Sequence, residues 1–217
     1  MLSFIHVAFL AIAVVYNAVS CKPPVIDPVI CPDGWTIWNR TDLNNKDVQY
    51  CIKLIVNSLI WTIDDANVAC GQELNGAALT IYTNKEEKEW LVSNAMTALA
   101  NIGLPRGSVA VAGRRKPVCA TLDSAILRSE QCDYSKNMFT IDDSLSIEYI
   151  LNNWALCEPN NGKVNGKYSS CLHVLIKKGD TFVHGRINDL ACEEKTYPAH
   201  NDAPLFNTYL ALCGKKL

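Results

Sequence analysis

The spacing of apolar residues predicts a first helix over residues 62–74. Ile63, Ala66, Cys70 and Leu74 recur at helical intervals and therefore share one face. Thr62 precedes this stretch and an acidic residue follows it three positions later, which is a variant of the capping box that begins many helices. The pattern predicts an amphipathic helix whose apolar face lies against a core.

A second helix is expected from about residue 84 to about residue 100. Thr83 and Glu86 have the spacing of a capping box at its start. Its apolar positions fall on one helical face and are Trp90, Leu91, Ala95 and Ala98.

Runs rich in β-branched and aromatic residues predict strands between turn signals. The first two runs, 31–39 and 49–56, flank a polar stretch and are expected to form a hairpin. The later runs predict a short strand, a second hairpin and a closing strand, at residues 77–81, 171–176 with 181–185, and 209–213.

Residues 107–170 show no helical periodicity and mix short apolar runs with Gly, Asn, Asp and Ser. Such a long irregular stretch is uncommon in a compact domain and is usually functional where it occurs. The predicted order is strands, two helices, a long loop and strands. This order defines an α+β fold with both ends of the chain in sheet.

The N-terminal segment has the features of a secretion signal. Residues 1–20 contain no charged side chain, and their apolar run, 7–15, is too short to span a bilayer. The small residues at positions 18 and 20 predict cleavage just before Cys21. We therefore expect a signal peptide at 1–20, a proline-rich leader at 21–30, a single domain at 31–217, no membrane span and a secreted, extracellular protein.

The composition indicates one globular domain that does not bind nucleic acid. Hydrophobic residues make up 49% of the 217 residues and charged residues 19%, which supplies enough apolar side chains for a core. The formal net charge is −2, so the chain lacks the basic field that binding to a polyanion requires. The run of three basic residues at 114–116 is expected to lie in a solvated turn.

Ten cysteines in a secreted chain indicate disulfides rather than a zinc site, because no Cys-x-x-Cys pair occurs. The signatures of serine hydrolases, zinc proteases and P-loop proteins are also missing from the sequence, so no enzymatic activity is expected. Asn39 begins the one Asn-x-Ser/Thr sequon and is the expected glycosylation site.

Two motifs in the second half resemble the C-type lectin-like domain family. Residues 154–161 read Trp-Ala-Leu-Cys-Glu-Pro-Asn-Asn and match the family pattern W-x-x-x-E-P-N. Residues 188–192 resemble the family's W-N-D-x-x-C segment, with Ile187 where the tryptophan usually stands. The resemblance covers about residues 31–215, is weakest over 104–150, and looks most like divergent secreted invertebrate members with a single domain. It implies two helices flanking small antiparallel sheets, with a long ligand-binding loop.

The resemblance also implies how most cysteines pair. Cys70 would pair with Cys213, and Cys171 with Cys192, as the family's two bridges. Two further expected bridges are Cys31 with Cys51 and Cys119 with Cys132. Cys21 and Cys157 remain, and either they pair with each other or Cys21 links two chains.

Four residues of the two motifs are the expected calcium and carbohydrate ligands, because calcium prefers carboxylate and amide oxygens. By resemblance, Glu158, Asn160, Asn188 and Asp189 would each bind the ion and also hold vicinal sugar hydroxyls, with a cis Pro159 turning the first two toward one point. The Glu-Pro-Asn order resembles mannose-type members, which implies a preference for equatorial 3- and 4-hydroxyls.

One departure from the family pattern keeps a second function open. The family places a further acidic ligand two residues before Cys171, and this chain has Ser169 there. The first hypothesis is a secreted, calcium-dependent carbohydrate-binding protein, with a role in innate recognition implied by the family. The alternative is a calcium-independent lectin-like domain that binds a protein or serves as a scaffold. Because single lectin sites bind weakly, a homo-oligomer would suit the first hypothesis.

Overall fold

The main sheet is assembled from both ends of the chain. The computed structural model describes residues 30–133, 137–141, 148–197 and 202–217. In this part of the chain the sheet runs, from edge to edge, through β1 (Thr36–Thr41), β2 (Asp47–Trp61), β10 (Thr208–Lys216), β4 (Arg106–Arg115), β8 (Cys171–Lys177) and β9 (Arg186–Leu190). β3 (Ala78–Leu79) also pairs with β10, and β5 (Phe139–Thr140) pairs with β4. β10 and β4 are parallel, and the other pairs are antiparallel.

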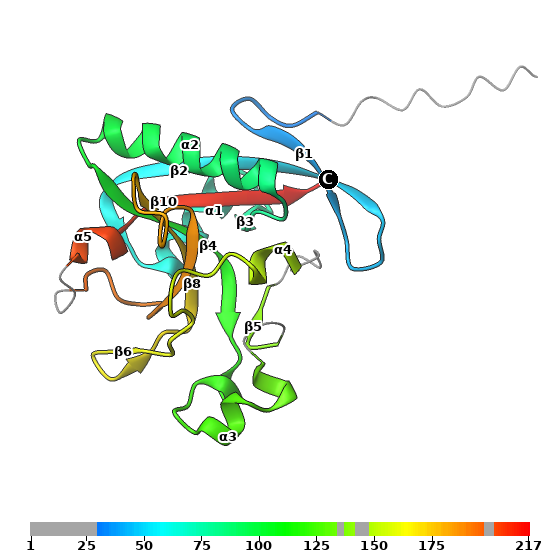
Figure 1. The fold of residues 1–217 in the computed structure, drawn as a ribbon. Helices are drawn as coiled ribbons and strands as arrows, with labels where there is room; N and C mark the ends of the chain where they lie inside the picture. The colour runs from blue at the N-terminus through cyan, green and yellow to red at the C-terminus, as the bar shows by residue number, and fades with distance from the viewer. Residues whose placement is uncertain (1–29, 134–136, 142–147, 198–201) are drawn as a thin grey trace, which may run out of the picture.

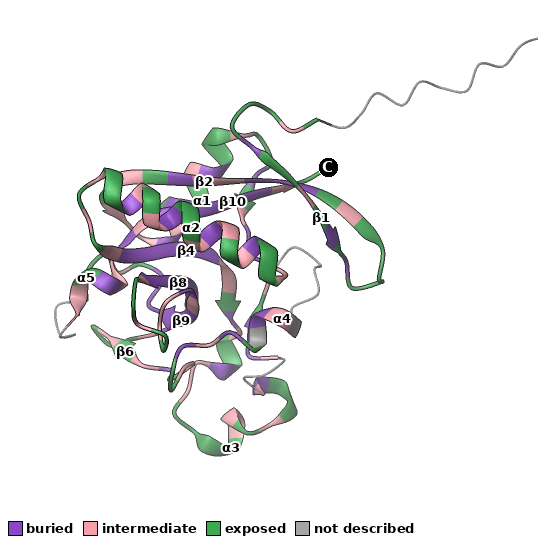
Figure 2. Cartoon of the chain, turned by 45° about the horizontal axis from the view of Figure 1, so that its top comes forward, coloured by how far each residue is buried: buried purple, intermediate pink, exposed green. Residues whose placement is uncertain are grey.

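Two helices cover opposite faces of this sheet (Figure 1). α2 (Lys85–Asn101) contributes to an apolar cluster that contains Val109 and Val111 of β4. α1 (Ile63–Glu73) contributes to a second cluster, which contains Ala110 of the same strand. Successive residues of a strand point to opposite faces. Val109 and Val111 therefore lie on the face covered by α2, and Ala110 lies on the face covered by α1. Figure 2 shows buried and exposed residues alternating along α2, as expected for a helix with one face on a core.

The first helix begins as its sequence predicts. The Thr62 hydroxyl accepts a hydrogen bond from the Asp65 N–H at 3.0 Å, and the Asp65 carboxylate accepts one from the Thr62 N–H at 3.3 Å. This reciprocal pair satisfies two of the donors that a helix N-terminus leaves free. The predicted capping box and the predicted helix are both confirmed.

The second helix is also confirmed, but its predicted cap was one residue too early. The cap residue is Asn84, whose side chain accepts from the Glu87 N–H at 2.8 Å. Glu87 in turn accepts from the Thr83 N–H at 2.8 Å. Asparagine is as good an N-cap as threonine, and its amide oxygen reaches the first turn here.

Residues 106–115 form a central strand, so the predicted long loop over 107–170 is wrong for its first part. β4 lies between β10 and β8, and residues 107–111 are all buried. A strand covered on both faces shows no alternation of polar and apolar residues, so the period-of-two signal is missing. The short elements of the remaining stretch are η1 (Pro117–Cys119), α3 (Ser124–Leu127), η2 (Glu130–Cys132), α4 (Glu148–Leu151), β6 (Lys163–Val164) and β7 (Lys167–Tyr168).

The second hairpin has its return strand at 186–190, five residues later than the predicted 181–185. Asp180 accepts from the Phe182 N–H at 3.1 Å, which is a local turn contact. Gly185 adopts φ of 69°, a left-handed conformation that glycine reaches without strain. These turn interactions override the β propensity of the intervening residues. The closing strand, β10, follows a short helix, α5 (Ala203–Phe206), and contains the predicted residues 209–213.

Four disulfides hold these elements together, and they are the pairings that the resemblance implies. The bridge between Cys70 and Cys213 joins α1 to β10 across 143 positions of sequence. The other three bridges are Cys31–Cys51, Cys119–Cys132 and Cys171–Cys192. Cys157 is exposed and has no disulfide partner in the described ranges, and Cys21 lies outside them.

A buried ion pair joins the first strand to the second helix. Arg40 Nε donates to Glu87 Oε1 at 2.8 Å, and Arg40 Nη2 donates to Glu87 Oε2 at 2.9 Å, so the contact is bidentate. The guanidinium also donates to Thr80 Oγ1 and lies over the Tyr50 ring, 4.7 Å from its centroid. These contacts fix β1 against the core.

The predicted signal peptide and leader lie outside the described residues, apart from Ile30, and so remain predictions. Within the described residues, no helix is both long and apolar enough to cross a membrane.

Candidate functional site

The two predicted motifs come together at one end of the sheet. Asn188 and Asp189 lie on β9, and the loop that follows α4 is tied to the same strand by two backbone hydrogen bonds. The Ala155 N–H donates to the Ile187 carbonyl, and the Ile187 N–H donates to the Asn153 carbonyl, both at 2.8 Å. The structure therefore brings the loop carrying Glu158 and Asn160 alongside the Asn-Asp pair.

Asp189 holds this loop through its backbone. Its Oδ1 accepts from the Asn160 N–H and its Oδ2 accepts from the Asn161 N–H, each at 3.3 Å. The peptide bond between Glu158 and Pro159 is cis, as the resemblance implies. Asp189 is itself buried, so the loop conformation depends on a carboxylate without access to water.

Glu158 and Asn160 form a carboxylate–amide pair toward the surface. Asn160 Nδ2 donates to Glu158 Oε1 at 2.9 Å, and the Asn160 N–H donates to Glu158 Oε2 at 2.8 Å. Asn160 is exposed and Glu158 is half-buried. Burial, together with the hydrogen bond and charge of the neighbouring Asp189, raises the pKa of Glu158 well above its usual range. The pair thus presents a hydrogen-bond acceptor and a donor side by side.

Asn188 points into the interior, where it meets a buried histidine. Its Nδ2 lies 3.1 Å from His173 Nε2. Burial lowers the pKa of His173 to about 3, so the ring is neutral at physiological pH. Among the described residues, none donates a hydrogen bond to Asn188 Oδ1, which is fully buried. Asn188 therefore lies in the interior beneath the motif loop and does not reach the surface.

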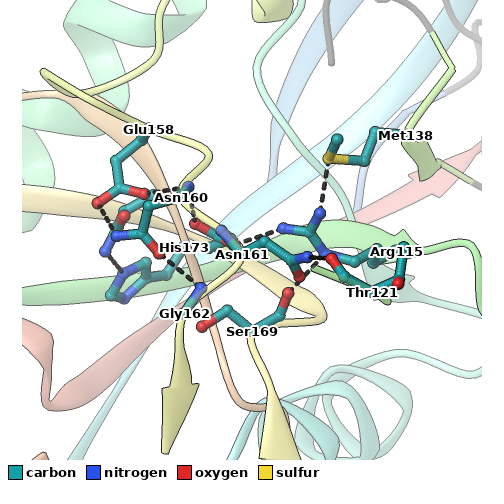
Figure 3. Close-up of polar contacts among 11 residues, drawn as sticks. Arg115, Thr121, Met138, Glu158, Asn160, Asn161, Gly162, Ser169 and His173 are labelled. Carbon is teal, nitrogen blue, oxygen red and sulfur yellow. Dashed lines mark hydrogen bonds and ion pairs between the residues drawn. The ribbon is translucent and has the colours of Figure 1, made fainter. Parts of the chain in front are cut away.

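Arg115 lies inside the site and not in the solvated turn that the sequence predicts for residues 114–116. The Arg115 and Asp189 side chains are both completely buried, and Nη2 donates to Asp189 Oδ2 at 2.5 Å. Nε donates to the Ser169 carbonyl at 2.7 Å, and Nη1 lies 2.6 Å from Met138 Sδ. Figure 3 shows this arginine reaching between Met138 and Ser169.

The bulge in β4 explains why Arg115 points inward. The register of β4 against β8 shifts between Val111 and Arg114, and Arg114 then stands opposite Cys171. Arg114 lies on the face covered by α1 and pairs there with the exposed Asp64. The next residue must point to the other face, where the Arg115 guanidinium stacks 4.7 Å from the Phe139 ring centroid. The available sequence signal was the arginine pair at the end of an apolar run, because consecutive strand residues point to opposite faces and one of the two faces here is covered.

Ser169 contributes backbone but no charge to this cluster. It is buried, and its carbonyl is the acceptor for Arg115 Nε. Its N–H donates to the Gly162 carbonyl at 2.8 Å, which holds the far end of the loop that carries the Glu-Pro-Asn motif. The position that would hold an acid in the resembled pattern is thus occupied by a small side chain next to an arginine.

Comparison with known proteins shows the family of this chain. A family model described as C-type lectin domain-containing protein 141/158 matches residues 37–216. The chain belongs to this C-type lectin domain family. The predicted recognition and the predicted α+β lectin-like fold are therefore confirmed.

Two relatives of this lectin-like domain come from Caenorhabditis elegans. C-type lectin domain-containing protein 158 is 28% identical over 188 residues, which cover 85% of this chain and 88% of the relative. C-type lectin domain-containing protein 141 is 26% identical over 204 residues, with 85% and 66% covered. Among solved structures, botrocetin matches with a TM-score of 0.41 and 17% identity, covering 86% of this chain and 98% of that one. The snake venom toxin convulxin matches with a TM-score of 0.39 and 13% identity, covering 87% and 98%.

The four predicted ligands do not fit a calcium ion as they stand. Calcium in proteins takes six to eight oxygen ligands, with carboxylates balancing its charge. Of the two carboxylates here, Asp189 is paired with Arg115 and Glu158 accepts two hydrogen bonds from Asn160. Asn160 Oδ1 accepts from the Gly162 N–H at 2.7 Å. No group of three or more His, Cys, Asp or Glu side chains that could hold a metal occurs in the described part of the chain.

A hollow of about 660 Å³ opens beside Pro159, Asn160 and Asn161 of the motif loop. One wall is the loop of the Glu-Pro-Asn motif, and the other is the segment 117–133, which is closed by the Cys119–Cys132 disulfide. Its volume lies in the range of small-ligand sites. The lining residues combine apolar and charged side chains and are Leu127, Arg128, Glu130, Asp133, Met138, Pro159, Asn160 and Asn161.

A somewhat larger hollow, of about 700 Å³, lies between β2 and α1. Its lining includes the exposed apolar residues Val56, Leu59 and Val68, and it contains none of the residues of the two motifs. The smaller hollow is the better candidate for a ligand, because Pro159, Asn160 and Asn161 of the first motif line it.

Asn39 lies on β1, away from the loop site, with its side chain exposed. Thr41, which completes the sequon, is exposed as well. An oligosaccharyl group on Asn39 would meet no core residue, so glycosylation of this position stays a prediction.

Proposed function

We propose that this protein is a secreted glycan-recognition domain that binds neutral sugars without calcium, at the Glu158–Asn160 pair and the adjoining hollow. The observation that carries the proposal is the geometry of this pair. Asn160 Nδ2 donates to Glu158 Oε1 at 2.9 Å, and Asn160 also lines a cavity of about 660 Å³. Asn160 Nδ2 has a second N–H, and the Glu158 carboxyl oxygens have further lone pairs, so vicinal hydroxyls can accept from the amide and donate to the acid.

Family membership supports a recognition role rather than catalysis, since the C-type lectin family is generally non-enzymatic. The four disulfides agree with an extracellular location, because such bridges persist in oxidising compartments. A mannose-type preference remains part of the proposal, since it rests on the order of the acid and the amide in the motif. A single metal-free site of this kind binds weakly, so we expect the protein to gain avidity from several copies or from clustered glycans.

A protein ligand is the second candidate function, and the observation that favours it is the Arg115–Asp189 ion pair. This pair leaves the predicted ligands without the calcium that would hold sugar hydroxyls directly. The same hollow, with charged residues at Arg128, Glu130 and Asp133, would then accept a charged peptide segment.

A glycan array separates these possibilities. The protein is displayed as a multivalent conjugate and probed once with calcium and once with a chelator. We expect the same mannose-, glucose-, N-acetylglucosamine- or fucose-containing glycans to bind in both conditions. Asn160→Ala is expected to reduce binding at least about tenfold, because it removes a hydrogen bond worth about 1.4 kcal/mol.

Asn94→Ala is the matched control, because Asn94 is an exposed asparagine on α2, far in sequence from the loop. It should leave binding unchanged. Loss of binding on chelation would refute the calcium-free site. An array without binding in either condition would refute glycan recognition and leave the protein ligand as the working function.

A further inference from the structure

We infer that Arg115 is an internal cation that takes the structural place of calcium in this lectin-like domain. It holds Asp189, and through Asp189 the loop 158–162, in the binding arrangement without a metal. The inference shares with the proposed function the claim that calcium is not needed. Its evidence and its test concern the cation alone and involve no glycan.

The positive charge of Arg115 lies beside the motif residue Asp189. The guanidinium contacts Asp189, the acid that the family resemblance assigns to calcium, at 2.5 Å. Both side chains are excluded from water. A buried carboxylate needs a positive partner, and here the chain supplies one where an ion would otherwise be required.

The contact between Arg115 and Asp189 also affects the loop, because Asp189 binds the loop backbone. Asp189 accepts the backbone N–H groups of Asn160 and Asn161 while it is paired with Arg115. Hydrogen bonds to a charged acceptor are shorter and stronger than those to a neutral one. The loop conformation is thus tied to the arginine through a single aspartate.

Arg115 packs next to Ser169, the position where the family pattern has an acid. The arginine donates to the Ser169 carbonyl, and the serine side chain leaves the space beside it without a second acid. Met138 and Phe139 cover the remaining faces of the guanidinium. Planar guanidinium groups are suited to such a site because they combine directed donors with stacking. With a serine at 169, the site has one negative charge fewer than the family pattern, and the single positive charge of Arg115 is enough to balance Asp189.

Arg114 provides a matched control within the same strand. It has the same side chain and also contacts an acid, Asp64, but the side chains of Arg114 and Asp64 are both about half exposed. Surface pairs of this kind contribute little to stability. Any effect special to Arg115 must therefore come from its buried position beside Asp189.

The test measures thermal unfolding of the whole chain in a chelator and in 10 mM calcium chloride, about ten times the weakest Kd usual for extracellular calcium modules. The wild type is expected to unfold at the same temperature in both conditions. Arg115→Met should lower the midpoint by about 10 °C, whereas Arg114→Met should change it by about 2 °C or less. Equal effects of the two substitutions would overturn the inference.

The combination of Arg115→Met with Ser169→Glu tests the exchange of cation directly. It removes the internal charge and supplies the acid that the family pattern has at this position. We expect this variant to bind calcium with a Kd of about 0.1–1 mM and to regain thermal stability when calcium is added. A folded double variant that gains nothing from calcium would overturn the inference.

Arg115→Lys keeps the test decisive where the methionine variants fail to fold. Lysine preserves the charge but lacks the forked donors, so an intermediate loss of stability is expected. A loss no greater than that of Arg114→Lys would overturn the inference. Calcium-dependent stabilisation of the wild type would overturn it as well. A negative glycan array with these results unchanged would count against the proposed function only.

Discussion

Arg115 and Asp189 form an ion pair, 2.5 Å from nitrogen to oxygen, in which neither side chain is exposed to solvent. The two residues are 74 positions apart, and each comes from a strand next to β8. A buried ion pair makes a small net contribution to the free energy of folding, because the cost of removing both charges from water offsets their attraction. A substitution that removes only one of the two charges is therefore the destabilising one, because the other charge stays buried without a counter-charge.

Asp189→Asn leaves Arg115 buried without a counter-charge. We expect this substitution to lower the free energy of unfolding by about 3–5 kcal/mol, measured by urea denaturation. Asp64→Asn is the control, because it breaks the exposed pair with Arg114 and should cost less than about 1 kcal/mol. Equal costs for the two substitutions would show that the buried pair is not formed.

The ion pair between Arg40 and Glu87 is expected to behave in the same way. Glu87→Gln keeps the shape of the side chain but removes the negative charge that faces the buried Arg40 guanidinium, so the free energy of unfolding should fall by about 3–5 kcal/mol. Glu73→Gln breaks a surface pair with Lys53 and should change it by less than about 1 kcal/mol. Chemical denaturation of both variants checks the difference, and a Glu87→Gln cost as small as the control would contradict it.

The sequence could predict the two helices because their signals are local. Thr62 and its partner three residues later act within one turn, and the apolar faces repeat within each segment. The motif residues Glu158 and Asp189 were found for a different reason, since their spacing matches a family pattern. The central strand β4 could not be found by periodicity, because both of its faces are covered. Arg115 was missed because its role depends on Asp189, which is distant in sequence.

The capping box of α1 predicts a pH dependence of stability. Hydrogen bonds from Thr62, together with Lys195, lower the pKa of Asp65 below its ordinary value. Because the folded pKa is the lower one, this contribution is fully present above the unfolded value of about 4 and is lost as the pH falls through the folded value. Asp65→Asn should therefore lower the unfolding temperature at pH 7 and have little effect near pH 2. An effect of the same size at both pH values would contradict this assignment.

The disulfide between Cys119 and Cys132 is expected to order one wall of the hollow. The two cysteines are 13 positions apart, and the segment that they close begins at the last residue of η1 and contains α3 and η2. Replacing both cysteines by serine should increase amide hydrogen exchange over residues 117–133, while β4 and β10 keep their protection. Exchange that rises equally in the central strands would mean that this bridge supports the whole domain instead.

Glycosylation at Asn39 can be checked by mass spectrometry of protein secreted from eukaryotic cells. A glycosidase should reduce the mass of the wild type, and Asn39→Gln should remove this shift without affecting secretion. The side chain is exposed and makes a single hydrogen bond in the described structure, to Gln49 at 3.3 Å, so its loss should be tolerated. A wild-type protein with no mass shift would show that the sequon is not used.

The most direct test of the central claim is isothermal titration of calcium into the chelator-treated wild-type protein. Our account predicts no saturable heat up to about 10 mM, a concentration above the usual range for extracellular calcium modules, because Arg115 already neutralises Asp189. Saturable binding at or below about 1 mM that disappears in Asp189→Ala would contradict it, and would return the protein to the calcium-dependent lectins.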